Sequence, residues 1–339
     1  MLKERRKIIK KIQEKRKSIV ISLFFGDRRG LPTRVHPEVL PYLYKLLKKS
    51  VKKDSKVDLF LYGTGGLTNA AWGIANLLNE FSDHYNVLVP FKALSAFTLI
   101  ALGAKEIIMT ELGQLSPVDP SVNSPYNPES PEQLKGAPRN LLPVPVEDCI
   151  SFFDIAKKEA GIKGDEELAK VFISLTEKIH PLALGNVYRS REQIKMLSKK
   201  LLSRNIKDEG KRNKIVDILT KELYSHDYII SRSEVENLLK LSIKHDKEIE
   251  SLISDLFYKY DETVQIGKPY IPEIEFQEAK SNNSEMIYER AYIESEDHCF
   301  CFISHRRFNE LSVQRPGVPF REKVIKQQEL FQGWRIKND

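Results

Sequence analysis

Long hydrophobic segments are missing from this chain of 339 residues. A helix that spans a membrane needs about 20 consecutive apolar residues, whereas the longest apolar run, Ile19 to Phe25, has the length of a β-strand. The basic residues at the start are not followed by the apolar segment that defines a secretory signal. These absences argue against an integral membrane protein, and we expect a cytoplasmic one.

Cysteine is scarce as well. The chain has three cysteines, Cys149, Cys299 and Cys301, and an odd, small number fits a reducing compartment. Cys299 and Cys301 stand two positions apart in an alternating apolar run, but no second cysteine pair or ordered set of histidines accompanies them, as it would in a zinc site. We therefore expect these thiols to pack inside the protein, and we expect neither a metal nor an organic cofactor.

Acidic residues are fewer than basic ones, and the formal net charge is +7. Much of the excess lies in residues 1–17, where Leu2, Ile8, Ile9 and Ile12 form a thin apolar stripe. We interpret this arm as a solvated helix that docks on the body of the protein or on a neighbouring subunit. A patch that binds nucleic acid or a membrane surface is the less favoured alternative, because no aromatic residues alternate with the charges.

Apolar runs and helical periodicity alternate over the first third of the chain. The pattern predicts strands over residues 18–25, 57–62, 87–91 and 106–110, and helices over residues 1–17, 36–49, 67–81 and 95–102. Strands that alternate with helices imply crossover connections and a largely parallel sheet. At 41% hydrophobic residues, the chain can bury a proper core.

The rest of the chain has a different composition and a different pattern of apolar residues. Residues 121–145 are rich in Pro, Asn and Ser and predict an excursion or flap, and helical periodicity then continues to about residue 224 with a break at His180-Pro181. A strand end followed by a capped helix is expected over residues 229–239. The runs IPEIEFQEA and MIYERAYIESEDHCFCFIS predict antiparallel strands, and residues 322–331 predict a short helix.

Two turns between strand and helix carry the residues with the clearest chemistry. The first has the sequence Gly-Thr-Gly-Gly, from Gly63 to Gly66, and a di-glycine turn can offer backbone N–H groups to a developing negative charge. The second places Ser95 where a strand gives way to a helix, beside N–H groups and the positive end of a helix dipole. Together they suggest a nucleophile and its oxyanion hole.

These motifs resemble a known family. GTGG at Gly63 to Gly66, ALSAFTLIALGAKEIIM from Ala93 to Met109 and LSPVDP from Leu115 to Pro120 are similar to the serine dehydrogenase proteinase (SDH) family of the Clp-peptidase and signal-peptide-peptidase-A superfamily. The later elements SHDY and EV, at residues 225–228 and 234–235, match that family too. The resemblance covers most of residues 1–245. It implies a Clp/crotonase-like ββα superhelix with a small C-terminal β-rich extension.

The resemblance also implies roles for single residues. Ser95 would be the nucleophile, and the N–H groups of Gly66, Gly65 and Ala96 would hold the oxyanion. Two positions depart from the family pattern: Thr64 replaces a proline, and Phe97 stands where the family has a glycine. We expect the bulky Phe97 ring to narrow or fill the acyl pocket.

The general base is left open between several residues. The family places a lysine at Lys158, which needs burial to act as a base, and it places His226 close to the site, where a neutral histidine needs little adjustment of its pKa. His180, in the segment KIHPLALG, is a further candidate, while Asp119 is expected to be a turn residue.

We therefore expect a cytoplasmic serine peptidase with three parts: the basic helix of residues 1–17, a hydrolase domain of residues 18–245 and an α+β extension of residues 246–339. Its partners would be a peptide or protein substrate and further copies of itself. Two alternatives remain. One is a non-catalytic scaffold or binding subunit with the same fold, and the other is an acyl-coenzyme A enzyme of the crotonase fold.

Overall fold

A computed structural model of the protein describes residues 2–52, 55–118, 121–122, 124–130, 141–142, 144–223, 225, 227–279, 284–314 and 321–337. The chain divides into two compact units. Unit 1 consists of Met1–Leu115 and Ile230–Asp339, and unit 2 consists of Ser116–Ile229. No helix among the described residues has both the length and the apolar character needed to cross a membrane.

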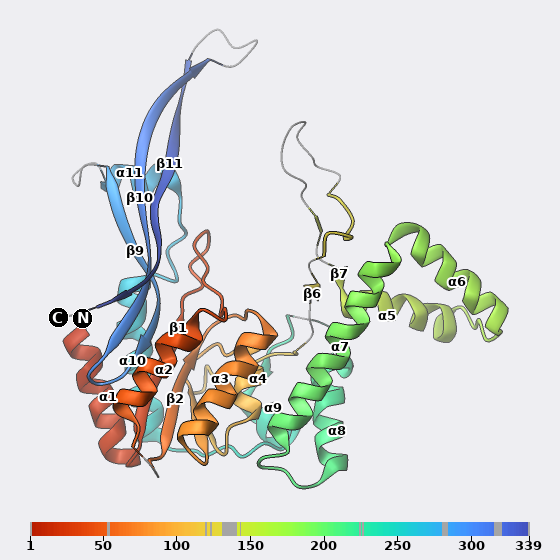
Figure 1. The fold of residues 1–339 in the computed structure, drawn as a ribbon, viewed down its shortest axis with the longest axis horizontal. Helices are drawn as coiled ribbons and strands as arrows, with labels where there is room; N and C mark the ends of the chain where they lie inside the picture. Colours follow the sequence, from red (N-terminus) through yellow and green to blue (C-terminus); the bar gives the residue numbers. More distant parts are fainter. Residues whose placement is uncertain are drawn as a thin grey trace. The chain divides into compact units, whose positions relative to one another are not determined.

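A seven-stranded mixed sheet forms the centre of unit 1 (Figure 1). Its strand order is β11-β10-β9-β1-β2-β3-β4. The first four strands of the chain pair in parallel. Strand β9 pairs antiparallel with β1, β10 pairs antiparallel with β9, and β11 pairs antiparallel with β10. The strands are β1 (Ile19–Phe25), β2 (Val57–Tyr62), β3 (Tyr85–Val89), β4 (Ile107–Met109), β9 (Glu285–Glu294), β10 (Cys299–Gln314) and β11 (Arg321–Ile336). A short antiparallel pair, β5 (Gln114–Leu115) with β8 (Ile230–Ser231), lies beside them.

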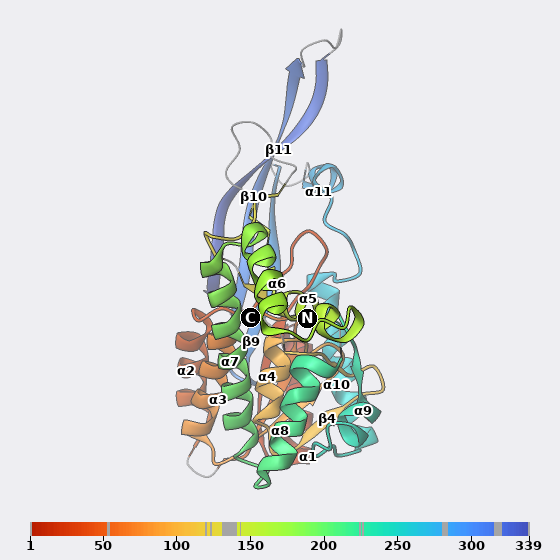
Figure 2. The ribbon, with the colours of Figure 1, turned by 90° about the vertical axis from the view of Figure 1, so that its right-hand side faces the viewer.

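Helices cover both faces of this sheet, as Figure 2 shows with α2 and α3 on one side and α10 on the other. The helices of unit 1 are α1 (Leu2–Arg16), α2 (Val39–Ser50), α3 (Thr68–Phe81), α4 (Ala96–Leu102), α9 (Arg232–Asn237), α10 (Lys247–Val264) and α11 (Pro272–Ala279). Neighbouring residues of β1 point to opposite faces. Phe24 stacks on Tyr62 and Tyr260 of the α10 side, whereas Phe25 packs against Phe97 of α4. This alternation follows from the two-residue period of a strand.

The basic arm packs on its own chain. Its stripe residues Ile9 and Ile12 are fully buried against α10. The Arg5 side chain is also buried: its Nε donates to Glu294 at 2.9 Å, and its guanidinium lies over the rings of Tyr260 and Tyr292. Docking on the body is therefore confirmed, and the buried part of the stripe is not available to a neighbouring subunit.

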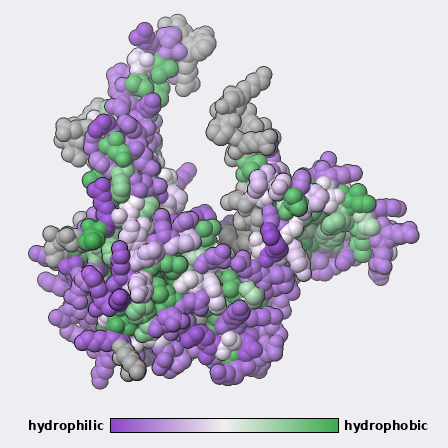
Figure 3. All heavy atoms as spheres, in the orientation of Figure 1, coloured by the Kyte–Doolittle hydropathy of each residue, from purple (hydrophilic) through white to green (hydrophobic). Residues whose placement is uncertain are grey.

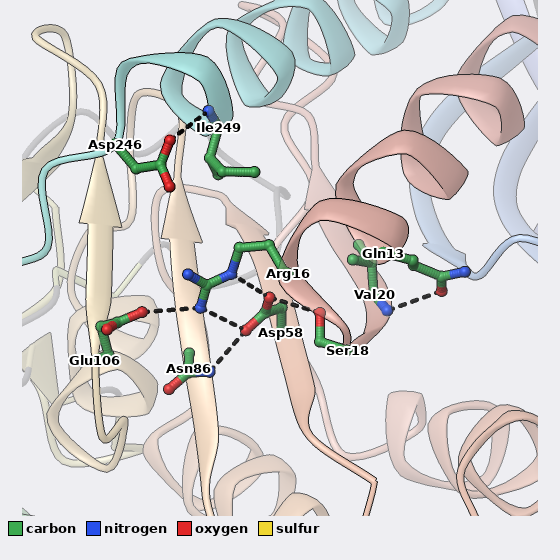
Figure 4. A network of polar contacts seen from close by, with 9 residues as sticks. All are labelled: Gln13, Arg16, Ser18, Val20, Asp58, Asn86, Glu106, Asp246 and Ile249. Atoms are coloured by element: carbon green, nitrogen blue, oxygen red, sulfur yellow. Dashed lines mark hydrogen bonds and ion pairs between the residues drawn. The ribbon is translucent and has the colours of Figure 1, made fainter.

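A polar network closes the amino ends of the parallel strands (Figure 4). Arg16, at the end of α1, donates through Nε to Asp58 at 2.6 Å and through Nη2 to Glu106 at 2.8 Å. Asp58 also accepts from Ser18 and Asn86. One arginine thus links α1 to residues on β2 and just before β4, which explains why a carboxylate is tolerated inside the sheet.

Unit 2 is mainly helical. Its elements are β6 (Ser121–Val122), β7 (Val144–Pro145), α5 (Val146–Asp154), the π-helical turn η1 (Ile155–Glu159), α6 (Asp165–Lys178), α7 (Pro181–Leu202), α8 (Glu209–Asp217) and the π-helical turn η2 (Ile218–Glu222). The predicted break at His180-Pro181 is confirmed, because α6 ends at Lys178 and α7 begins at Pro181.

Two predictions for the C-terminal region are wrong. The run IPEIEFQEA forms the helix α11, in which Phe276 packs under β9 and β10. The predicted helix of residues 322–331 belongs to β11, which pairs with β10 along its whole length. In both cases the partner surface, rather than the local pattern, decides the conformation.

Candidate active site

The di-glycine turn follows directly from β2. Gly65 and Gly66 have positive φ angles of 128° and 152°, a region that favours glycine. Two hydrogen bonds fix the turn, from the Val35 N–H to the Gly65 carbonyl and from the Leu67 N–H to the Val35 carbonyl. A Cβ atom on Gly66 would lie 2.2 Å from the Val35 carbonyl oxygen. Both the backbone angles and the contact therefore require glycine.

Ser95 occupies a strained position between the end of β3 and the start of α4. Its φ of 54° and ψ of −112° are unusual for a residue with a side chain. It is the N-cap residue of α4, yet its hydroxyl makes no capping hydrogen bond. A capping role therefore does not explain the serine, and backbone strain of this kind is concentrated at functional sites.

Backbone hydrogen bonds hold the two turns against each other. The Gly63 N–H donates to the Lys92 carbonyl at 2.9 Å, and the Leu94 N–H donates to the Gly63 carbonyl at 3.0 Å. A Cβ atom built on Gly65 would lie 3.3 Å from the Ser95 hydroxyl oxygen. The glycine turn and the serine are thus in contact, in agreement with the sequence spacing.

Two N–H groups beside the serine have no acceptor among the described residues. They belong to Gly66 and to Ala96, the first residue of α4. Gly66 and Ser95 are both partly accessible, whereas Ala96 is buried. Available N–H groups next to an accessible hydroxyl are what the oxyanion of an acyl-transfer reaction requires.

Phe97 lies under the turn and belongs to the core. Its ring is fully buried 5.5 Å from Phe25, between ring centroids. The ring occupies the space where a side chain of Gly63 would be, while the space beside Gly65 is taken by Ser95. The large residue is therefore accommodated by a glycine of the same motif.

A polar cluster lies at the same edge of the sheet, and the sequence analysis did not identify it. The Lys92 ammonium donates to Asp27 at 2.7 Å, and the Tyr62 hydroxyl donates to the other oxygen of Asp27 at 2.5 Å. Burial, followed by the negative charge of Asp27, raises the pKa of Tyr62. All three residues lie at the carboxyl ends of parallel strands, where α/β folds place their ligands. The signal was present in the sequence: Asp27 and Lys92 follow the apolar strands closely.

The residues predicted as candidate bases belong to unit 2. Lys158 is in η1, with a side chain that is 67% exposed and paired with Asp154 at 2.8 Å. This exposure does not supply the desolvation that a lysine base needs. His226 and Asp119 lie outside the described residues. His180 is the N-cap of α7, where its Nδ1 accepts from the Leu182 N–H.

Among the described residues, the cysteines and acidic groups form no recognisable metal site. Cys299 and Cys301 are buried on β10, and Cys149 is buried in α5. Across the part of the chain that the structure describes, no three histidine, cysteine, aspartate or glutamate side chains are grouped to hold a metal ion.

Comparison with known proteins gives a family match for the N-terminal part of the chain. Residues 1–159 match the model of the family described as ClpP-like SDH-type serine proteinase. This segment contains the sheet strands β1 to β4, the glycine turn and Ser95. Residues 1–159 are therefore similar to ClpP-like serine proteinases of the SDH type, and the mixed α/β fold carries a β-rich C-terminal region.

Two proteins of Methanocaldococcus jannaschii are similar to the chain, and both are named as uncharacterized. MJ0137 is 27% identical over 267 residues, which are 77% of this chain and 80% of that protein. MJ1495 is 27% identical over 223 residues, 65% of this chain and 63% of that protein. A solved structure of a membrane-bound stomatin-specific protease, a serine-to-alanine mutant, has a TM-score of 0.37 at 12% identity and covers 63% of this chain and 77% of its own. A TM-score this low carries no argument about the site.

Proposed function

We propose that this protein is a serine peptidase in which Ser95 is the nucleophile. The supporting observation is the strained backbone of Ser95 beside the Gly65 turn. The fold keeps this conformation although a side chain at this position costs about 1–3 kcal/mol. A cost of this size is accounted for if the conformation directs the hydroxyl at a substrate.

In the proposed reaction, the Ser95 oxygen attacks the carbonyl carbon of a peptide bond and passes its proton to a general base. The carbonyl oxygen becomes an oxyanion, which the N–H groups of Gly66 and Ala96 stabilise, with Gly65 shaping the turn. Collapse of the tetrahedral intermediate releases the amine, which takes up the proton. Water then attacks the acyl-enzyme and regenerates the serine.

Lys158 and His226 remain the proposed alternatives for the general base, with His180 as a further candidate. A lysine must be neutral to accept the proton, and the exposed Lys158 would have to become buried when substrate binds. A histidine could act without such a change. We also propose that the protein is cytoplasmic and forms a homo-oligomer.

A fluorophosphonate probe tests the proposal, because it reacts covalently with an activated serine. We expect the probe to add to Ser95 of the wild-type protein, with peptide mapping by mass spectrometry as the measurement. Ser95→Ala should remove both labelling and hydrolysis of a fluorescent casein. Ser251→Ala, which changes an exposed serine of α10, is the matched control and should leave both unchanged.

Labelling of another serine, or hydrolysis retained by Ser95→Ala, would contradict the assignment. A wild-type protein that neither reacts nor hydrolyses any acyl substrate would favour a non-catalytic subunit. The exposure of Lys158 is the observation that favours this second candidate function, because an exposed lysine is a poor general base.

A further inference from the structure

A polar cavity of about 460 Å³ lies in unit 1, at the amino ends of the parallel strands. Its walls come mainly from the residues just before β2, β3 and β4 and from the segment after α9, and every described lining side chain is polar. The volume is in the range of sites for small molecules. The lower edge of unit 1 in Figure 3, where the parallel strands begin, is mainly hydrophilic. The cavity is therefore suited to a charged ligand rather than to an apolar one.

This cavity is remote from the candidate active site. Lys56 directly precedes β2 and Gly63 directly follows it, so the two positions are about 20 Å apart at the rise of a β-strand. Parallel α/β sheets bind their substrates at the carboxyl ends of the strands, where Ser95 lies. A ligand at the amino ends would therefore occupy a second site.

Three lysines around the cavity have no ion-pair partner among the described residues. They are Lys56, Lys105 and Lys244, and all three side chains are exposed. Backbone hydrogen bonds to β1, β3 and β4, respectively, hold these positions in place. Of the two carboxylates in the lining, Glu106 is already paired with an arginine, which leaves Asp83 alone against the three lysines. The described lining thus carries an excess of positive charge.

Arg16 adds a buried donor to the same cavity. Its side chain is 8% exposed, and its Nε and Nη2 donate to Asp58 and Glu106. The remaining nitrogen, Nη1, has no hydrogen-bond partner among the residues that the structure describes (Figure 4). Guanidinium N–H groups are strong donors to anionic oxygens. A donor left over in a buried side chain therefore points to an anion as the ligand.

The nearby helix ends satisfy their carbonyls without these lysines. Helices α3 and α4 end close to this edge, and the carboxyl end of a helix attracts cations. The Ile100 carbonyl of α4, however, accepts from the Gly103 N–H and from the Tyr85 hydroxyl at 2.6 Å. The Leu78 carbonyl of α3 accepts from the Ser82 N–H. Within the described part of the chain, no lysine of the cavity is bonded to a helix carbonyl, so the lysines are available to a ligand.

We propose that this cavity binds a small ligand that carries several phosphate groups, either a condensed phosphate or a phosphate ester. The three lysines stand on different segments, so one phosphate cannot occupy all of them, whereas two or more can. The hydroxyls of Ser55 and Ser242 provide neutral donors on the same lining. No aliphatic side chain or phenyl ring belongs to the described lining, so recognition rests on the phosphate groups. The proposal does not depend on the role of Ser95.

Isothermal titration calorimetry of the full chain with inorganic tripolyphosphate is the first test. We expect one ligand per chain, and binding should weaken as KCl is added because salt screens the lysines. Lys105→Gln and Lys244→Gln should each raise the dissociation constant about tenfold, the effect of losing one charge-assisted hydrogen bond. Lys326→Gln removes the same charge from an exposed position in β11, outside the cavity, and is the matched control with unchanged binding.

Asp83→Asn tests the sign of the ligand charge. Removing this carboxylate should lower the dissociation constant for tripolyphosphate about threefold, because an exposed charge acts only weakly through solvent. Weaker binding in Asp83→Asn would contradict an anionic ligand at this place. Circular dichroism should show that this variant and the lysine variants remain folded, since all of the substituted side chains are exposed.

Two further ligands distinguish the sources of the phosphate groups. Fructose 1,6-bisphosphate should bind more tightly than tripolyphosphate if the ligand is a phosphate ester, and less tightly if it is a condensed phosphate. ATP should bind no more tightly than tripolyphosphate, because the described lining offers no apolar surface to the base. A strong preference for ATP would overturn recognition through phosphate groups alone.

The proposal fails if none of the three ligands binds with a dissociation constant below about 1 mM. It also fails if the double variant Lys105→Gln with Lys244→Gln binds tripolyphosphate as the wild type does. Ser95→Ala should bind the ligand normally. Failure of this site and failure of the proposed peptidase activity are therefore distinguishable.

Discussion

Gly63 and Phe97 share one space under the di-glycine turn. A Cβ atom on residue 63 would lie 2.4 Å from two ring carbons of Phe97, although the residues are on different turns. The ring in turn packs on Phe25 of β1. The bulky residue at position 97 is thus matched to a glycine that has no side chain.

Gly63→Ala should therefore destabilise the protein by about 1–3 kcal/mol, the usual cost of overpacking a core. The added methyl group meets a ring that has no free space, so the turn and α4 must shift. Chemical unfolding monitored by circular dichroism measures the effect. Adding Phe97→Leu should recover part of it, and additive losses in the double variant would show that the two residues do not compete.

The variants Ser95→Gly and Ser95→Ala distinguish the effect of backbone strain on stability from the effect of the hydroxyl on hydrolysis. Both should abolish hydrolysis, but the glycine variant should be the more stable by about 1 kcal/mol, because only glycine adopts the Ser95 backbone conformation without strain. The same pair of substitutions at Ser251, inside α10, should give the reverse order, since glycine weakens a helix. An alanine variant as stable as the glycine variant would argue against strain at Ser95.

The general base should appear in the pH dependence of hydrolysis. If His226 accepts the proton, activity should rise with pH near ~6.5, the ordinary histidine value. If Lys158 is the base, activity should rise only in a more alkaline range, where the ammonium loses its proton. Lys158→Ala and His226→Ala, each measured from pH 5 to about 10, distinguish these cases. Unchanged turnover in both variants would exclude both residues.

The buried pair of Arg5 and Glu294 should make a measurable contribution to stability. Arg5→Met leaves the Glu294 carboxylate without its cation and should cost about 3–5 kcal/mol at pH 8. Glu294→Gln on the Arg5→Met background should recover part of this loss.

The deficit of Arg5→Met should shrink as the pH falls. Burial already raises the pKa of Glu294 in the native protein, and removing Arg5 raises it further. The folded variant therefore binds a proton that the unfolded chain has released, so its stability is full below the unfolded value and declines as pH rises. A deficit that is constant between pH 5 and about 8 would contradict this account.

The three thiols should be unreactive in the native protein. Burial raises the pKa of Cys149, Cys299 and Cys301, so the thiolate that attacks a disulfide reagent is rare. We expect no reaction with an aromatic disulfide at pH 8 until denaturant is added, when all three should react. Rapid reaction of a native thiol would show that local opening exposes it.

The sequence predicted the N-terminal half of the sheet because its signals are local. Apolar strands such as β1 and β2, the glycine turn and the start of α4 at Ser95 are specified within short windows. The capping box of Ser231 and Glu234 likewise marks the start of α9.

Contacts that are distant in the sequence could not be predicted in this way. Strand β11 is held by β10, and α11 is held by Phe276 packing on the outer strands. The contact of Lys92 with Asp27 needs the ends of β3 and β1, which lie on either side of β2, to meet at one edge of the sheet. The positive φ of Ser95 is a property of the assembled turns, since nothing in its neighbouring residues demands it.

The position of β1 between β2 and β9 affects how the chain is made. Ser22 pairs with Glu294 on one side, whereas Phe60 of β2 is its partner on the other. Synthesis proceeds from the N-terminus at about 5–20 residues per second, so β1 has an open edge until nearly the whole protein has left the ribosome. The growing chain therefore carries an unpaired apolar strand for seconds to a minute. Conditions that delay synthesis of the last three strands should therefore increase aggregation of the growing chain. The molecules that are completed should keep their activity.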